Sequence, residues 1–249
     1  MTWYYTDTGF NTGEFNMQFD LALSKNILPG QAILRFYRWE PFCISLGFNQ
    51  SIDSIDYSKA KEEGIGIVKR PTGGRAVLHA EELTYSVVMP CQAGSSPKII
   101  YKEINEALKL GIEFYNKDLT MLEFETAQPN FQEIYKEKKG LICFATPAKN
   151  ELKYAGKKIA GSAQRKIGNI ILQHGSILCG TYHKKIIDYL SLEDKDYSAI
   201  LDELNNKTIE IETVINKKVN YDELKKALVK GFESFYSMQF LPYQIKNEL

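Results

Sequence analysis

The chain contains 249 residues, 44% of them hydrophobic, which is enough for one large domain or one domain with a small appendage. Its 31 basic and 31 acidic residues give a formal net charge of zero, which argues against a nucleic-acid or anionic-membrane partner. Because no apolar run could span a membrane and the N-terminal residues do not form an export signal, we expect a cytoplasmic protein that does not bind membranes.

The cysteines and histidines argue against disulfides and against a metal site. The four cysteines are far apart in the sequence and form no C-x-x-C pair, which is typical of reduced cytosolic thiols. The three histidines show no H-x-x-x-H spacing, so we expect neither a structural nor a catalytic metal.

The N-terminal region is expected to contain strands and short helices. Residues 3–5 are a candidate aromatic strand, and the spacing of apolar residues predicts a helix over 14–27. Alternating residues predict a strand over 31–39, and residues 43–47 are expected to form a second strand that pairs with it as a hairpin. A short polar helix follows over 57–63.

A strand over 65–68 runs directly into a basic, glycine-rich loop, residues 69–75. Adjacent glycines let a backbone approach a ligand closely, and arginines can hold a carboxylate or a phosphate. A glycine turn with solvated arginines explains the same residues equally well. Residues 64–69 do not match a dinucleotide fingerprint, because Lys69 stands where the third glycine should be, and residues 156–163 do not match a Walker motif. Strands over 76–79 and 83–89 are then expected to pair in one sheet.

Helices dominate the sequence after residue 95, apart from the stretch 140–178. The pair Ser96-Pro97 predicts the start of a long amphipathic helix, whereas residues 119–140 look irregular and polar. Short helices are expected over 183–190 and 197–204. Asn220 opens the last helix with a sequence that resembles a capping box.

These elements predict an α+β fold made of two parts. Because the predicted strands all precede residue 180, we expect a catalytic domain over 1–180. A helical C-terminal segment over 181–249 is expected to pack on it. We find no internal repeat and no low-complexity linker.

The stretch 140–178 carries the residues most suggestive of chemistry. Cys143 ends a short apolar run and opens onto a loop, and a thiol is a useful nucleophile only when a nearby cation favours its ionised form. Lys158, on a predicted strand over 157–165, shares a face with small and polar residues, which suggests the floor of a site. An inert buried thiol and a solvated lysine remain the alternatives, and His174 is expected to be a core histidine.

Three motifs and their order resemble the lipoate–biotin protein ligase and octanoyltransferase superfamily. They are RPTGGRAVLHAEELTYS at 70–86, GKKIAGSAQ at 156–164 and QHGSIL at 173–178, and the resemblance covers most of the predicted catalytic domain. Within the superfamily the chain is most similar to the cysteine-dependent octanoyltransferases, which place a Cys-Phe pair, here Cys143-Phe144, before the lysine of the second motif. Lipoate-activating ligases lack that cysteine and typically have a glycine where this chain has Arg75.

The resemblance implies a mixed, largely antiparallel central sheet flanked by helices, as in biotin ligases and class II synthetases. It also implies octanoyl transfer from octanoyl-acyl carrier protein, through a thioester on Cys143, to the lysine of a lipoyl domain such as the glycine cleavage H protein. Lys158 would handle protons and polarise the acyl carbonyl. Since the acyl group arrives activated, no cofactor, nucleotide or metal is required, and we expect a monomer.

The resemblance further implies a set of substrate-binding residues. Glycines of the basic loop and a histidine would line the channel for the acyl chain, and backbone amides of the GSA segment would face the developing oxyanion. The arginines would contact acidic partner domains. The full set is Arg70, Thr72, Gly73, Gly74, Arg75, His79, Gly161, Ser162 and Ala163.

Three other functions fit parts of the sequence. An ATP-dependent lipoate–protein ligase would keep Cys143 as an incidental residue, and a lipoyl amidotransferase would move octanoyl between lipoyl domains. A non-catalytic protein that binds lipoyl domains would need neither Cys143 nor Lys158. We expect the octanoyltransferase that uses a carrier protein, because both residues accompany motifs that fit it better.

Overall fold

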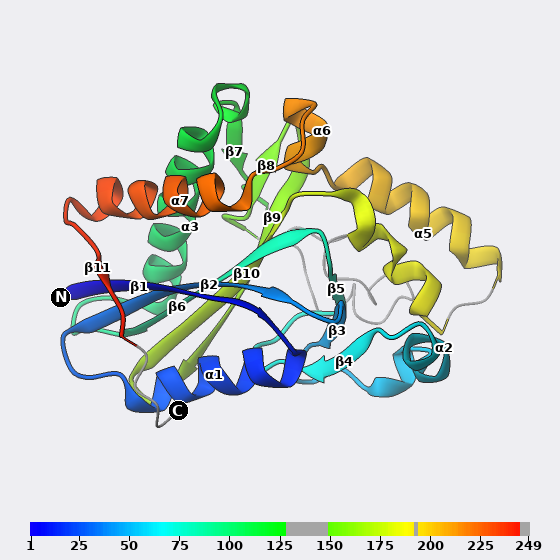
Figure 1. Cartoon of the computed structure of the whole chain (residues 1–249), viewed down its shortest axis with the longest axis horizontal. Helices are drawn as coiled ribbons and strands as arrows, with labels where there is room; N and C mark the ends of the chain where they lie inside the picture. Colours follow the sequence, from blue (N-terminus) through cyan, green and yellow to red (C-terminus); the bar gives the residue numbers. More distant parts are fainter. Residues whose placement is uncertain (128–148, 192–193, 245–249) are drawn as a thin grey trace.

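The structure is a computed structural model, which describes residues 1–127, 149–191 and 194–244. A large sheet lies at its centre with helices on both faces (Figure 1). The α-helices are α1 (Gly13–Asn26), α2 (Tyr57–Glu62), α3 (Pro97–Tyr115), α5 (Asp194–Lys207), α6 (Ile211–Ile215) and α7 (Tyr221–Tyr236). The 3-10 helices are η1 (Ile52–Ser54), η2 (Lys117–Leu119) and η4 (Thr181–Tyr189).

The central sheet is eight-stranded, in the order β11-β1-β2-β6-β10-β9-β8-β7. Strand β1 pairs in parallel with β11 and with β2, and the neighbouring pairs from β2 to β7 are antiparallel. The expected fold class, an α+β fold with a mixed and largely antiparallel sheet, is therefore confirmed. The strands are β1 (Thr2–Asn11), β2 (Gln31–Trp39), β6 (Glu82–Pro90), β7 (Leu122–Phe124), β8 (Leu152–Tyr154), β9 (Lys157–Ile167), β10 (Ile170–Leu178) and β11 (Leu241–Pro242).

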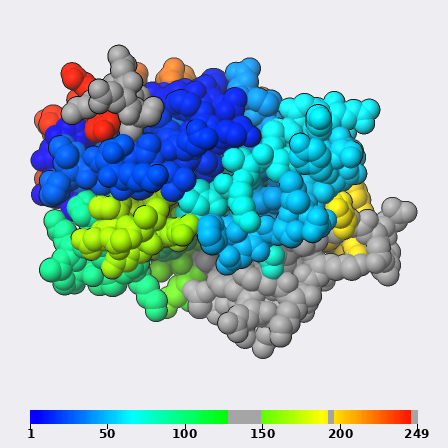
Figure 2. All heavy atoms as spheres, turned by 90° about the horizontal axis from the view of Figure 1, so that it is seen from below, coloured from blue at the N-terminus to red at the C-terminus, as the bar shows by residue number. Residues whose placement is uncertain are grey.

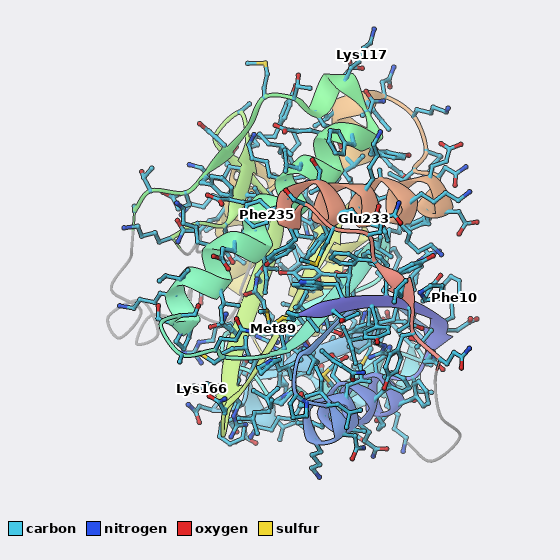
Figure 3. The ribbon with its side chains drawn as sticks, turned by 90° about the vertical axis from the view of Figure 1, so that its left-hand side faces the viewer. Phe10, Met89, Lys117, Lys166, Glu233 and Phe235 are labelled. Atoms are coloured by element: carbon cyan, nitrogen blue, oxygen red, sulfur yellow. The ribbon has the colours of Figure 1, made fainter. Side chains whose placement is uncertain are left out.

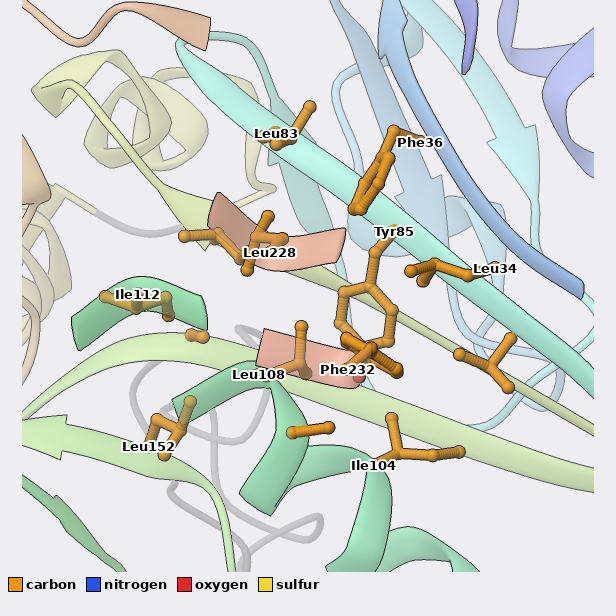
Figure 4. Close-up of a cluster of buried hydrophobic side chains, with 14 of the residues drawn as sticks. Leu34, Phe36, Leu83, Tyr85, Ile104, Leu108, Ile112, Leu152, Leu228 and Phe232 are labelled. Carbon is orange, nitrogen blue, oxygen red and sulfur yellow. The ribbon is translucent and has the colours of Figure 1, made fainter. Parts of the chain in front are cut away.

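Helices α3 and α7 cover one face of this sheet and enclose the largest core (Figures 1 and 4). Ser96 and Asn220 cap the two helices, since each side chain accepts a hydrogen bond from a backbone N–H of the first turn. The helices touch at two glycines: a Cβ on Gly231 would lie 2.2 Å from the Gly111 nitrogen. Glycine at both positions therefore permits the close contact that seals the core.

Helix α1 lies on the opposite face of the sheet, away from α7 and α3 (Figure 3). Its apolar residues Phe19 and Leu23 pack on Ile33 of β2, Val88 of β6 and Leu172 of β10. The same helix also turns polar side chains towards the sheet, and these are buried. They are Asn16, Asp20 and Ser24.

A second, three-stranded sheet stands beside the first, in the order β4-β3-β5. It is formed by β3 (Cys43–Leu46), β4 (Gly66–Lys69) and β5 (Val77–His79). Its core side chains, such as Ile44 and Leu78, pack with Ile187 of η4 and Leu204 of α5. The helices that follow residue 180 thus divide between two cores, because α7 packs on α3 whereas η4 and α5 pack on the small sheet.

Two predicted strand pairings are wrong. Strand β3 does not form a hairpin with β2: all four of its residues are buried, and it lies between β4 and β5 as the middle strand of the small sheet. Likewise β5 and β6 belong to different sheets, because Leu78 packs against η4 whereas Leu83 packs in the core beneath α3. The first strand is also longer than predicted, and β7 lies where an irregular segment was expected.

Candidate active site

A pocket of about 430 Å³, with its open mouth included, lies between the central sheet, α1 and the small sheet. Figure 2 views the molecule from this side, where α1, the segment that contains the small sheet and the end of the β9–β10 hairpin meet. The residues that line the pocket are Met17, Tyr37, Trp39, Ser45, Arg70, Val77, His79, Thr84, Gly161, Ser162, Ala163, His174, Gly175 and Ser176.

The expected site residues divide into four sets. Those that line the pocket are Arg70, His79, Gly161, Ser162 and Ala163. Those in the adjoining loop are Thr72, Gly73, Gly74 and Arg75. Lys158 lies on β9, the strand that also carries the GSA segment. Cys143 falls outside the described residues.

His79 is held rigidly in the pocket wall. Its Nε2 lies 2.7 Å from the Ser45 hydroxyl and its Nδ1 lies 2.8 Å from a Glu82 carboxylate oxygen. The ring stacks on Trp39 with 4.0 Å between centroids, and Trp39 in turn donates to Thr84. Burial alone would raise the pKa of Glu82, but His79 and nearby hydroxyls outweigh it and lower that pKa. His79 therefore presents a fixed surface to the pocket, backed by an ionised carboxylate.

Asp20 of α1 organises a second polar cluster behind the pocket. Its carboxylate accepts from Arg35 at 2.7 Å, from Ser86 at 2.8 Å and from Tyr37 at 3.1 Å. Burial would raise the pKa of Asp20, but the Arg35 guanidinium and His174 lower it overall. The charged pair therefore fixes α1 against the strands that line the pocket.

His174 links that cluster to the glycine-rich loop. One ring nitrogen lies 3.4 Å from Asp20, and the other lies 2.6 Å from the Thr72 hydroxyl. Burial lowers the pKa of His174, so the imidazole is mainly neutral at pH 7. His174 is buried, as predicted, but it also lines the pocket, and Thr72 acts as its partner in the loop.

Arg70 binds the loop itself. The N–H groups of its guanidinium donate to the carbonyl oxygens of Ser45, Gly73 and Arg75 and to the Ser45 hydroxyl, at distances from 2.7 to 3.1 Å. The side chain is 5% exposed. Arg70 therefore shapes the pocket wall, and the loop is more than a glycine turn with solvated arginines.

The glycines of this loop allow a close backbone contact. Gly74 has a φ of +98°, and a Cβ on Gly47 would lie 1.9 Å from the Gly74 oxygen. The loop is also tied to the end of β9, because Arg165 donates to the Pro71 oxygen at 2.9 Å. The same guanidinium lies over the Phe48 ring, 4.5 Å from its centroid. These contacts hold the loop beside the pocket mouth.

Lys158 is a buried, paired cation. Its side chain is 1% exposed, and Nζ lies 2.8 Å from Oε2 of Glu151, whose side chain is 3% exposed. The other oxygen of Glu151 accepts from the backbone N–H of Ser162 at 3.2 Å. A solvated surface lysine, the alternative left open by the sequence, is therefore wrong.

Several residues of this region were missed by sequence reasoning. Glu151, Glu82 and Asp20 look like solvated carboxylates in a sequence, yet all are buried beside a cation or a histidine. For Asp20 a signal existed: Asn16, Asp20 and Ser24 recur every four residues and form a polar stripe on one helix face. No comparable pattern surrounds Glu151.

The thiols that the structure describes are all buried. Burial raises the pKa of Cys43 and of Cys179, as expected for inert thiols. Within residues 1–127, 149–191 and 194–244, no group of three or more His, Cys, Asp or Glu side chains could hold a metal ion. In the same ranges, no helix combines the length and apolar character needed to cross a membrane.

Comparison with known proteins decides the family. The profile described as "Lipoyl protein ligase A/B catalytic domain" matches residues 12–233. The chain belongs to this family. Among family members, Octanoyltransferase LipM of Bacillus subtilis is 34% identical over 257 residues, covering 99% of this chain and 91% of that protein. Octanoyltransferase LipM of Staphylococcus epidermidis is 35% identical over 258 residues, with the same coverage.

Solved structures of the lipoyl ligase family have the same fold. A bipartite lipoate protein ligase from Thermoplasma acidophilum superposes with a TM-score of 0.77 at 21% identity, covering 99% of this chain and 87% of that one. A lipoate-protein ligase A bound with ATP gives 0.76 at 21% identity, covering 99% and 89%. At this identity the likeness establishes the fold, which is the lipoate ligase fold that the sequence motifs implied.

Proposed function

We propose that this chain transfers an octanoyl group from octanoyl-acyl carrier protein, through a thioester on Cys143, to the lysine of a lipoyl domain in lipoate biosynthesis. The acyltransferase activity rests on similarity to LipM octanoyltransferases along 99% of the chain. The donor, the acceptor of the glycine cleavage H protein type, the monomeric state and the cytoplasmic location are parts of the proposal.

The reaction proceeds in two steps. In the first, Cys143 sulfur forms a bond to the acyl carbon, the bond from that carbon to the carrier's sulfur breaks, and the proton of Cys143 ends on the carrier thiol. In the second, the lysine amine of the lipoyl domain forms an amide bond to the acyl carbon. The bond to Cys143 then breaks, and the amine's proton returns to the cysteine. No nucleotide is consumed, because the donor is already a thioester.

The observation that carries the proposal is the placement of Lys158. A buried ammonium on β9, the strand whose Gly161, Ser162 and Ala163 line the pocket, can stabilise a thiolate and a developing oxyanion at low local dielectric. We assign to Lys158 the proton relay and the polarisation of the acyl carbonyl. The pocket between Trp39, His79 and β9 takes the acyl chain.

The test is the intact mass of the protein after incubation with octanoyl-acyl carrier protein in the absence of ATP. Wild type is expected to gain one octanoyl group, which hydroxylamine removes, whereas Cys143→Ala gains none. Cys91→Ala is the matched control, because that thiol is buried at 7% exposure, and it is expected to behave like wild type.

Two results would contradict the proposal. No adduct on wild type, with activity only when free octanoate and ATP are supplied, would indicate the ATP-dependent ligase. An adduct that persists in Cys143→Ala would show that another residue is the nucleophile.

A further inference from the structure

The carboxylate of Glu151 connects two hydrogen-bond donors of β9 that lie four residues apart. Oε2 contacts Lys158 Nζ at 2.8 Å, and Oε1 accepts from the Ser162 N–H at 3.2 Å. Glu151 is itself anchored, because its backbone oxygen accepts from the Glu125 N–H at 2.9 Å, just before β8 begins. One fixed side chain therefore sets the position of both donors.

The pairing of β9 with β10 makes the Ser162 amide distinctive. In an antiparallel ladder, successive residues direct their N–H groups to alternate sides of the strand. Because the Ser162 N–H points to Glu151, away from β10, the amides of Gly161 and Ala163 face β10, where they are registered with Ser176 and His174. Of the three amides in the GSA segment, the Ser162 amide is therefore the one directed away from the ladder with β10.

Lys158 needs an anion in this position. Its side chain is 1% exposed, and a buried ammonium without a counter-charge is strongly disfavoured and gives up its proton. Glu151 supplies the counter-charge from 2.8 Å and limits the directions in which the long lysine side chain can extend. Glu151 therefore keeps Lys158 both charged and in a fixed position.

We infer that Glu151 is a positioning residue for acyl transfer: tied to β9 through the Ser162 N–H, it keeps Lys158 charged and aligned so that the ammonium serves the acyl carbonyl. The inference rests on the proposed function, because it concerns the lysine assigned there. Glu151 acts through Lys158 and takes no covalent part in the reaction.

The test is the rate of octanoyl loading of the full-length protein, measured by quenched mass spectrometry against pH for wild type and Glu151→Gln. Loss of the anion is expected to move the alkaline limb of the profile to lower pH by about one to three units, since an opposite charge at this distance shifts a titration by that amount. The loading rate at saturating donor concentration is also expected to fall, whereas the KM for the donor is expected to stay unchanged.

Glu125→Gln is the matched control. Glu125 also pairs with a lysine, with 3.2 Å between its carboxylate and Lys153 Nζ, and its side chain is 11% exposed. It lies beside β8 as Glu151 does, but its carboxylate contacts Lys153 and the Ala127 N–H instead of Lys158 and Ser162. Its substitution is expected to leave the alkaline limb in place, which separates the positioning of Lys158 from the general loss of a partly buried ion pair.

A double-mutant cycle gives a second readout. In a Lys158→Ala background, Glu151→Gln is expected to cause no further loss of loading rate, because its partner is gone. Additive losses, or an alkaline limb that does not move in Glu151→Gln, would overturn the inference. If Glu151→Gln does not fold, Glu151→Asp decides: it keeps the charge on a shorter side chain, and a wild-type loading rate would overturn the positioning role.

The outcomes separate the two proposals. Absence of any octanoyl adduct on wild type would overturn the proposed function, and the assignment of Glu151 with it. A normal wild-type adduct combined with an unaltered pH profile in Glu151→Gln would overturn only the role of Glu151.

Discussion

The pair formed by Asp20 and Arg35 offers a sharp test of what holds the pocket together. Neither side chain has exposed surface, and the carboxylate also accepts from Tyr37 and Ser86. Asp20→Asn keeps the shape of the side chain and removes its charge. The Arg35 guanidinium would then remain buried without an anion, although it keeps its hydrogen bonds to Asn16.

Breaking a buried ion pair by removing one charge destabilises a protein by about 3 to 5 kcal/mol. For a protein of this size, each kcal/mol corresponds to roughly 2 to 4 °C, so the melting temperature should fall by about 6 to 20 °C. The loss should also depend on pH. Because the folded-state pKa of Asp20 is lowered, its stabilisation is present above its unfolded pKa of about 3.9 and is lost as the pH falls through the folded value.

Urea denaturation at pH 7 and thermal melting over a series of acidic pH values measure both effects. Asp7→Asn is the control, because its pair with Lys225 lies at the surface and the Asp7 side chain is 39% exposed. That change should alter the free energy of unfolding by less than about 1 kcal/mol. A loss below about 1 kcal/mol for Asp20→Asn, or one that does not shrink in acid, would refute the reasoning.

Two further substitutions test the loop and the helix contact. A lysine in Arg70→Lys cannot reach all the oxygens that the guanidinium contacts. The KM for the octanoyl donor should therefore rise, and the free energy of unfolding should fall by about 1 to 3 kcal/mol. An unchanged KM in steady-state assays would argue against a loop that shapes the pocket. Gly231→Ala should destabilise the fold by about 1 to 3 kcal/mol in urea denaturation, because its Cβ would meet the Gly111 backbone at 2.2 Å. Gly73→Ala, whose Cβ meets no atom within 4 Å, should unfold like wild type, and equal stabilities for the two variants would contradict the packing argument.

Local signals predicted many individual elements well. The strand over 31–39 is confirmed residue for residue, and the caps at Ser96 and Asn220 start the helices that they were expected to start. These signals need only a few neighbouring residues, namely alternation for a strand and a side-chain acceptor for a helix start. Their success therefore did not depend on tertiary contacts.

The partners of the strands could not be predicted in the same way. Strand β3 joins β4 and β5 because Ile44 packs in one core with Ile187 and Leu204, which are more than a hundred residues away along the chain. Alternation shows that a segment is a strand but contains no information about which apolar surface will cover it. The hairpin expected from proximity in sequence was wrong for that reason.

In the candidate site, too, the residues within motifs were predicted, whereas their tertiary contacts were not. The motifs led to the loop and to the residues of β9, and the structure brings His79 and the GSA segment into one pocket. The carboxylates that hold them were missed, because a glutamate such as Glu151 is usually solvated and only the fold brings Lys158 to 2.8 Å from it. Buried charge is a tertiary property, and the sequence alone does not reveal it.

The central claim is that the octanoyl group passes through the enzyme to a lipoyl domain. The most direct measurement isolates the octanoylated protein free of donor, adds an unmodified lipoyl domain such as the glycine cleavage H protein without ATP, and follows both masses over time. We expect the enzyme to lose one octanoyl group as the lipoyl domain gains one in amide linkage. Release of free octanoate with the lipoyl domain unmodified would contradict it.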